Sequence, residues 1–174
     1  GEARAAATLR SRMLDDLLAP NLRLVVCGSA AGRRSAQLRQ YYAGPGNKFW
    51  ATLAAVGLTP RRLAPSEWQC LLEFGIGLTD LVKGQSGGDR DLEFARADRD
   101  ALRAKVARFR PRMLCFNGKR SAKEFFGTAS VAYGLQEEAI GETRLFVAPS
   151  TSGAARAAWD TAPWLALAKR VRSG

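Results

Sequence analysis

The sequence predicts an α/β fold, a single three-layer domain whose mostly parallel central sheet is flanked by helices. Four apolar stretches typical of interior strands alternate with helical patterns along the chain. With 174 residues, 47% of them hydrophobic, the chain has the size of one domain with one sizeable core. Regular alternation of strand and helix favours a parallel sheet with helices on both faces. We therefore expect residues 1–174 to form one domain.

The first half of the chain is expected to supply two of the strands and three helices. Residues 5–18 mix charge with alanine and leucine, as a surface helix does. LRLVVCG at 22–28 and FGIGLTDLV at 74–82 are continuous apolar runs, which suit strands buried on both faces. Helices are expected at 47–57, where Phe49 and Trp50 would face the core, and at 65–73 after the start signal APSEW.

The second half repeats the alternation. A helix is expected at 97–109, a strand at 112–118 (RMLCFNG) and a helix at 119–126. TRLFVAPS predicts the fourth strand at 143–150, and a final helix is expected at 157–172. We find no internal repeat or low-complexity segment.

Charge and composition restrict the function. The chain has 27 Lys and Arg against 16 Asp and Glu, a formal net charge of +11, so its surface should attract polyanions, nucleic acid above all. It has no histidine, which argues against Ser-His-Asp and Cys-His nucleophile systems and most zinc hydrolases. Acid–base chemistry would fall to Asp, Glu, Lys, Tyr or water.

The cysteines and the apolar runs point to a soluble intracellular protein. Cys27, Cys70 and Cys115 are odd in number and far apart, which indicates neither a disulfide framework nor a metal or iron–sulfur site. Cys27 and Cys115 lie in apolar runs and suit small core side chains. No apolar run is long enough to span a bilayer, so we expect no membrane association. In a bacterium the protein is expected in the cytoplasm, associated with the nucleoid, and in a eukaryote it is expected in the nucleus.

The stretch from Gly28 to Asn47 is expected to be a loop far longer than a strand-to-helix turn needs. In a parallel sheet, ligands bind beyond the carboxyl ends of the strands. GSAAG carries only small side chains, so its backbone N–H groups could approach and bind a flat base, although a plain glycine turn is the simpler alternative. Tyr41 and Tyr42 could stack on that base or cover the core edge, and at most one of them is expected to enter the pocket.

Asp80 is the candidate catalytic residue. A carboxylate at the carboxyl end of an apolar strand is costly to desolvate and is often found where pKa values are perturbed, so Asp80 could orient and activate a water. The alternative is a capping or salt-bridging aspartate. Asp89 and Asp91 compete for the role, but they lie in a glycine-flanked loop, a poorer place to hold a catalytic group.

Two further loops carry cations and hydroxyls at the same edge. FNGKRS places Lys119 and Arg120 at a helix N-terminus, where they could contact phosphate or simply be solvated. STSGAAR, residues 150–156, could follow a nucleic-acid backbone with Arg156 paired to phosphate. It could also cap the last helix through Thr151 or Ser152.

Together these loops resemble a known family. GSAAG with QYYAGPGNKFW, GLTDLV, FNGK and STSGAAR are similar, in this order and over roughly residues 22–170, to the mismatch-specific uracil and thymine-DNA glycosylases of the uracil-DNA glycosylase superfamily. The resemblance implies a short parallel sheet between helices and a monomer that needs no cofactor. It implies hydrolysis of the N-glycosidic bond of a damaged or mispaired base flipped from duplex DNA.

The resemblance also assigns roles by position. The substrate-base pocket would comprise Gly28, Ser29, Ala30, Ser35, Tyr42 and Asn47. In it Gly28 and Ser29 would hold the base, Tyr42 would stack on it, and Asn47 would order the loop. The DNA-contacting and wedge residues would be Lys119, Ser150, Ser152, Gly153, Ala154, Ala155 and Arg156.

The chain departs from the family pattern in two places. Ala30 stands where the family usually has an asparagine that positions the attacking water, so we expect Asp80 to take that role. Ala154 and Ala155 stand where relatives carry a bulky wedge. Three alternatives stay open: a catalytically inactive nucleic-acid-binding domain, a hypoxanthine-DNA glycosylase and a binder of small nucleotides. The second is included because the tyrosine pair resembles that of a sister branch described as acting on deaminated purines.

Overall fold

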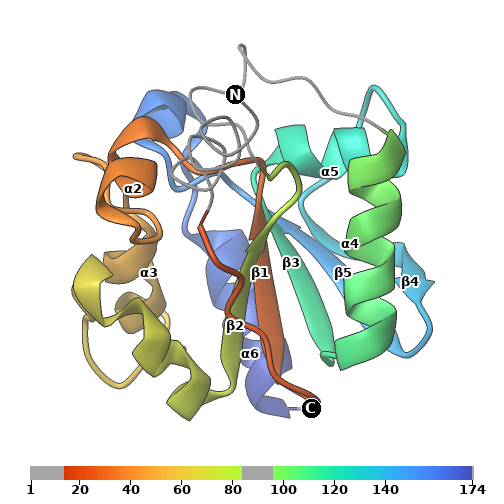
Figure 1. Cartoon of the computed structure of the whole chain (residues 1–174), viewed down its shortest axis with the longest axis horizontal. Helices are drawn as coiled ribbons and strands as arrows, with labels where there is room; N and C mark the ends of the chain where they lie inside the picture. Colours follow the sequence, from red (N-terminus) through yellow and green to blue (C-terminus); the bar gives the residue numbers. More distant parts are fainter. Residues whose placement is uncertain (1–13, 84–95, 174) are drawn as a thin grey trace, which may run out of the picture.

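A computed structural model describes residues 14–83 and 96–173 of the chain. These residues form a five-stranded sheet in the order β2-β1-β3-β5-β4, with helices on both sides (Figure 1). The first four strands in that order are parallel to one another, and β4 is antiparallel to β5. The strands are β1 (Leu24–Gly28), β2 (Ile76–Asp80), β3 (Met113–Asn117), β4 (Gly134–Ile140) and β5 (Thr143–Ala148). The predicted α/β fold with a short, mostly parallel sheet is confirmed.

The register brings the ends of the parallel strands together. Gly28, the last residue of β1, lies opposite Asp80, the last residue of β2. Asn117 at the end of β3 lies opposite Ala148 at the end of β5. Because parallel strands end at one edge of the sheet, the loops that follow all four strands gather there.

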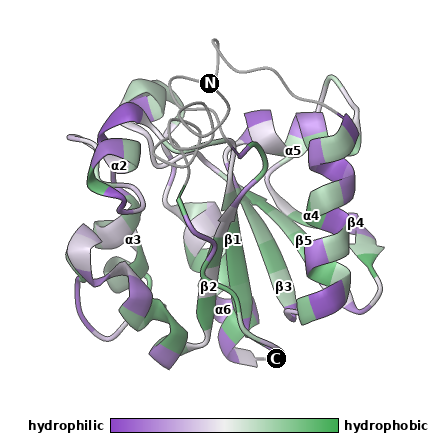
Figure 2. Ribbon diagram, viewed as in Figure 1, coloured by the Kyte–Doolittle hydropathy of each residue, from purple (hydrophilic) through white to green (hydrophobic). Residues whose placement is uncertain are grey.

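Two layers of helices cover the sheet, as their amphipathic sequences predict (Figure 2). The first face packs against α3 (Phe49–Ala55) and α6 (Ala162–Ser173), and the second against α4 (Arg96–Phe109) and α5 (Lys119–Phe126). The remaining helical segments are α2 (Arg33–Leu38) and the 3₁₀ helices η1 (Pro65–Phe74) and η3 (Gly153–Ala158).

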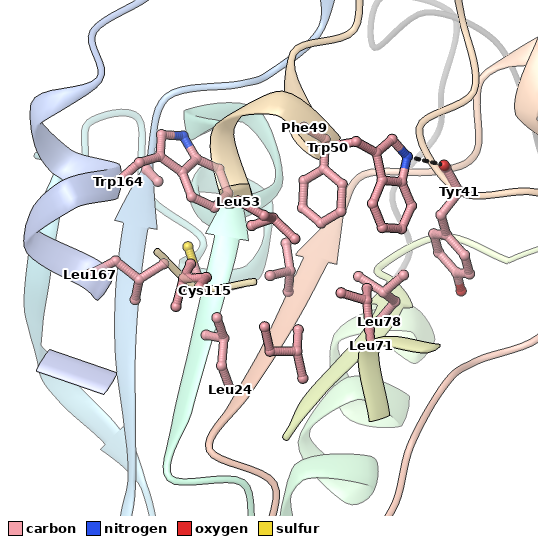
Figure 3. Packing of buried hydrophobic residues seen from close by; sticks show 14 of the residues in the cluster. Leu24, Tyr41, Phe49, Trp50, Leu53, Leu71, Leu78, Cys115, Trp164 and Leu167 are labelled. Atoms are coloured by element: carbon pink, nitrogen blue, oxygen red, sulfur yellow. Dashed lines mark hydrogen bonds between the residues drawn. The ribbon is translucent and has the colours of Figure 1, made fainter. Parts of the chain in front are cut away.

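Aromatic side chains fill the first of the two cores (Figure 3). Phe49 and Trp50 are buried there as predicted, with their ring centroids 5.0 Å apart in an edge-to-face arrangement. The indole N–H of Trp50 donates to the carbonyl oxygen of Tyr41 at 2.9 Å, and that of Trp164 donates to Pro149 at 2.9 Å. These two bonds attach the loops after β1 and β5 to the core. Cys27 and Cys115 are fully buried, as expected.

The structure departs from several sequence-based expectations about individual elements, in whole or in detail. The stretch after Gly28 contains a helix, α2, and is not a continuous loop. The helix expected at 5–18 falls mostly outside the described residues, and its described part, 14–18, is not helical: Leu17 instead forms an antiparallel bridge with Leu78 of β2. Strand β4 was not predicted. The segment 65–73 forms a 3₁₀ helix, and the last helix divides into η3 and α6.

Over the described part of the chain, no helix combines the length and the apolar character needed to cross a lipid bilayer.

Candidate active site

A cleft of about 1270 Å³ opens at the carboxyl edge of the sheet. It is formed by the segments that follow β1, β3 and β5 and by Asp80, the last residue of β2, which the strand register brings together. All fourteen residues that the sequence assigned to the site line it: Gly28, Ser29, Ala30, Ser35, Tyr42, Asn47, Asp80, Lys119, Ser150, Ser152, Gly153, Ala154, Ala155 and Arg156. The structure thus brings the predicted residues together, while their chemical roles stay predictions.

Asp80 lies at the closed end of this cleft with only 5% of its surface exposed. Backbone bonds fix its surroundings, since the N–H groups of Leu81 and Val82 donate to the carbonyls of Gly28 and Ser29 at 2.8 and 2.7 Å. The closest charged partner in the described chain is Lys83, whose Nζ lies 3.7 Å from Oδ2 of Asp80. Burial raises the pKa of Asp80 above its usual value, and Lys83 only partly offsets that rise.

Tyr42 lies beside Asp80 and carries an unsatisfied hydroxyl group. Its Oη is buried and makes no hydrogen bond of ordinary length and angle among the described residues, although the Asn117 side chain is close enough to lower its pKa slightly. Its backbone is in the left-handed region, at a φ of 52°, which a bulky residue rarely adopts and which is found mainly where the surrounding structure imposes it. Its ring packs on Phe49 with centroids 4.1 Å apart, so at most one ring face is left for a ligand. Burial, followed by the charge of Asp80, raises the pKa of Tyr42, and the hydroxyl stays protonated.

Gly28 allows these two side chains to approach each other. A Cβ on Gly28 would lie 2.9 Å from Oδ1 of Asp80 and 3.1 Å from Oη of Tyr42. The two oxygens are therefore at most about 6.0 Å apart. The absence of a side chain at this position thus brings a carboxylate and a phenol to the same point of the cleft.

The two adjacent tyrosines differ in burial, although both line the cleft, where at most one had been expected. Tyr41 is 1% exposed, packs on Trp68 with ring centroids 5.3 Å apart, and donates its hydroxyl proton to the carbonyl of Asp15 at 2.9 Å. Tyr42 is the partly exposed member of the pair. Tyr41 is therefore chiefly a core residue.

Ser35 and Asn47 both organise the loop that carries Tyr42. Ser35, in α2, accepts a hydrogen bond from the N–H of Ala43 at 2.9 Å. Asn47 accepts one from the N–H of Phe49 at 3.0 Å and so satisfies a donor at the start of α3. These bonds agree with the ordering role expected for Asn47. For Ser35, the bond to Ala43 indicates the same kind of ordering role, while its place near the base stays a prediction.

The segment 150–156 is held by its own hydroxyl groups. Ser150 accepts from the N–H of Ser152 at 3.2 Å, and Ser152 accepts from the N–H of Ala154 at 3.2 Å. Ser152 therefore caps η3. The sequence had suggested instead that it could cap the last helix. Gly153 packs so closely on Gly46 that a Cβ would lie 3.4 Å from the Gly46 carbonyl oxygen. Ala154 is exposed and Ala155 half-buried at the rim of the cleft.

Cations line the outer part of the cleft. Arg33, Arg34 and Arg156 are exposed, and Lys119 lies over the ring of Tyr133 at 4.3 Å from its centroid. Because they line one opening, a phosphate backbone could contact them while a nucleotide enters the cleft.

Four residues at or behind the cleft were missed from the sequence: Asp16, Lys83, Asn117 and Tyr133. Asn117 ends β3, donates to Oγ1 of Thr151 at 3.0 Å and accepts from the Thr151 N–H at 3.0 Å, which ties the loops after β3 and β5 together. Its place at a strand end, within FNGK, was the available signal. The competitors Asp89 and Asp91 lie outside the described residues. In the described ranges, no group of three or more Cys, Asp or Glu side chains is arranged to hold a metal ion.

Comparison with known proteins identifies the family. The family model described as "Uracil DNA glycosylase superfamily" matches residues 16–168, most of the chain. The chain belongs to this superfamily. A solution NMR structure from Methanosarcina acetivorans described as a "putative Uracil DNA glycosylase" has the same fold, with a TM-score of 0.59 and 22% identity over 93% of this chain and 98% of that one. The match confirms the superfamily resemblance, and it supports a function of the DNA glycosylase class for this chain.

Proposed function

We propose that this protein is a DNA glycosylase that hydrolyses the N-glycosidic bond of uracil, and of other mispaired or damaged bases, in duplex DNA and leaves an abasic site. The observation that carries the proposal is Asp80, a buried carboxylate at the closed end of a cation-lined cleft in a chain of the uracil DNA glycosylase superfamily. The mismatch preference comes from the motif resemblance and is part of the proposal.

The reaction needs three things from the protein. Cleavage of a deoxyribosyl bond passes through a sugar with oxocarbenium character, so the leaving base must carry off the bonding electron pair as an anion. The backbone N–H groups of the GSAAG segment are the groups we propose to stabilise that anion. The small side chains of Ser29, Ala30 and Ala31 leave the backbone accessible, and all three residues line the cleft.

Asp80 would supply the other two requirements, a negative charge near the sugar and a placed water. The water oxygen forms the new bond to C1′, the glycosidic bond breaks, and the water gives a proton to the Asp80 carboxylate. The raised pKa of Asp80 makes it a stronger base than an exposed aspartate. The Tyr42 hydroxyl, at most about 6.0 Å from Oδ1 of Asp80, could donate a hydrogen bond to the same water.

The outer cleft supports the expected mode of DNA binding. Contacts from Lys119, Arg156 and the arginines of α2 to phosphates would be independent of sequence. Flipping a base costs a few kcal/mol and costs least for a mispaired one, so a preference for mismatches needs no direct contact with the opposite base. This accounts for substrate selection with only Ala154 and Ala155 at the wedge position.

The test is a single-turnover assay with excess protein on labelled duplexes that contain one G·U, A·U, G·T or hypoxanthine pair, followed by alkali. We expect strand breaks with the wild-type protein and at least a hundredfold slower cleavage with Asp80→Asn. Glu138→Gln is the matched control, because it makes the same charge change at an exposed residue of β4. Full activity of Asp80→Asn would contradict the assignment of Asp80 and direct attention to Asp89 and Asp91.

A second candidate function is nucleic-acid binding without catalysis. Ala30 favours it, since an alanine side chain cannot hold a water where the family usually has an asparagine. The same assay separates the two functions: DNA binding with no strand breaks on any duplex would support the binding module. Breaks confined to the hypoxanthine duplex would instead identify a purine-directed glycosylase.

A further inference from the structure

A chain of charges runs behind Asp80, outside the cleft. Asp16, in the segment before β1, is 2.7 Å from Nζ of Lys83 through Oδ1 and 2.7 Å from Nζ of Lys105 through Oδ2. Thr79 donates its hydroxyl proton to Oδ1 of Asp16 at 2.7 Å. The proposed base, Asp80, is at the end of this chain, 3.7 Å from the Lys83 Nζ.

Lys83 is therefore bound to Asp16 more closely than to Asp80. Its ammonium group has three N–H donors, and it makes short contacts with the Asp16 carboxylate at 2.7 Å and the Leu14 carbonyl at 3.0 Å. Direct charge-assisted hydrogen bonds to carboxylates are about 2.7–2.9 Å long, so the distance of 3.7 Å to Asp80 is that of a charge held nearby without direct contact.

We propose that Asp16 is a positioning residue that holds the Lys83 ammonium back from Asp80. At that distance Lys83 stabilises the charge of the buried carboxylate from the side of Oδ2 without a direct hydrogen bond, which would make Oδ1, the oxygen beside the Tyr42 hydroxyl, a weaker proton acceptor. The proposal rests on the proposed function for the role of Asp80. The position of Lys83 is a property of the fold and can be measured separately.

The surroundings of Asp80 support this division of roles. Burial and the negative charge of Asp16 raise its pKa, while Lys83 and Lys105 lower it. The other titratable groups facing it, Cys27 of β1 and the tyrosines at 41 and 42, have raised pKa values of their own and stay neutral in the working range. Lys83 is therefore the cation whose position has the largest effect on Asp80.

Two variants that change the position of Lys83 test the proposal. In Asp16→Asn, Lys83 loses its strongest partner and is free to bind Asp80 directly. We expect the carboxyl titration of Asp80, followed by carbon-13 NMR, to move down by about one pH unit or more. The acidic limb of the single-turnover pH–rate profile should move with it, and the plateau rate should fall about tenfold because a carboxylate that accepts a direct hydrogen bond from Lys83 is a weaker base.

Removal of the lysine should have the opposite effect. Lys83→Gln should move the Asp80 titration up. In that background Asp16→Asn should retain only the smaller downward shift that comes from removing the Asp16 charge itself, because the shift that comes through Lys83 is lost. Asp16→Glu should retain a titration close to the wild type. Glu138→Gln, which makes the same charge change as Asp16→Asn away from the cleft, should move neither readout.

Four results bear on the proposal in different ways. An unchanged Asp80 titration in Asp16→Asn would overturn it, and so would a shift that persists in full without Lys83. Should Asp16→Asn fail to fold, Lys83→Arg keeps every charge but reaches further, and the same downward shift is expected. If the wild-type protein excises no base, the proposed function fails, and the NMR titration still decides whether Asp16 positions Lys83.

Discussion

Replacement of Gly28 by alanine tests the central geometry of the candidate site. The new Cβ would lie 2.9 Å from Oδ1 of Asp80, whereas ordinary contacts begin near 3.4 Å, so the carboxylate must retreat by at least about 0.5 Å. The Tyr42 hydroxyl, at 3.1 Å, must also move. Neither group moves easily, because Asp80 ends a strand paired with β1 and the Tyr42 ring packs on Phe49.

We expect a loss of both stability and activity. Overpacking of this kind costs about 1–3 kcal/mol of folding free energy, which thermal unfolding would measure. Since a misplacement of about 1 Å in a catalytic group can slow a reaction by about a hundredfold, a shift of about 0.5 Å should slow single-turnover excision at saturating protein by about tenfold. Gly44→Ala is the matched control, since nothing lies within 4 Å of a Cβ at Gly44. A Gly28→Ala protein that excises bases within about threefold of the wild-type rate would refute the reasoning.

Three further predictions use other features of the cleft. Tyr42→Phe should leave the melting temperature unchanged or higher, because it removes a buried hydroxyl without a partner that costs about 1–3 kcal/mol, and single-turnover excision should slow. Asp80→Asn should raise the melting temperature at pH 7 by a few degrees: the folded-state pKa of Asp80 is raised, so its ionisation lowers stability as pH rises, and the gain should vanish near pH 4. Arg156→Gln should weaken binding to all duplexes similarly and reduce the slope of log affinity against log salt by about one, measured by fluorescence titration.

Local sequence patterns predicted the four parallel strands and failed at the antiparallel strand β4. The strands β1, β2, β3 and β5 are buried almost throughout, although β2 forms one edge of the sheet, so their sequences are continuous apolar runs. The edge strand β4 reads GLQEEAI, with three consecutive exposed residues, and a polar edge strand has no such signature. Helix α2 was missed because a six-residue helix between glycine-rich turns gives too short a pattern to recognise.

The site was predictable where one residue occupies a characteristic place and not where distant residues meet. Asp80 and Gly28 were identifiable because each ends an apolar strand in a parallel sheet. The contact between Asp16 and Lys83 joins residues 67 positions apart, and it depends on the path of the segment before β1, where a helix had been expected. Tertiary packing decided that path, and no local periodicity could reveal it.

The departure from the family pattern and the charges behind Asp80 have one common explanation in the proposed mechanism. An asparagine can orient a water but cannot accept its proton, whereas a carboxylate can do both. A carboxylate at the closed end of the cleft is costly to bury, since burial favours its neutral form. Lys83 and Lys105 reduce that cost, and Asp16 keeps the nearer of these cations from direct contact with Asp80. A site with Ala30 in place of the usual asparagine would thus need the acidic and basic residues behind β2 as much as it needs Asp80 itself.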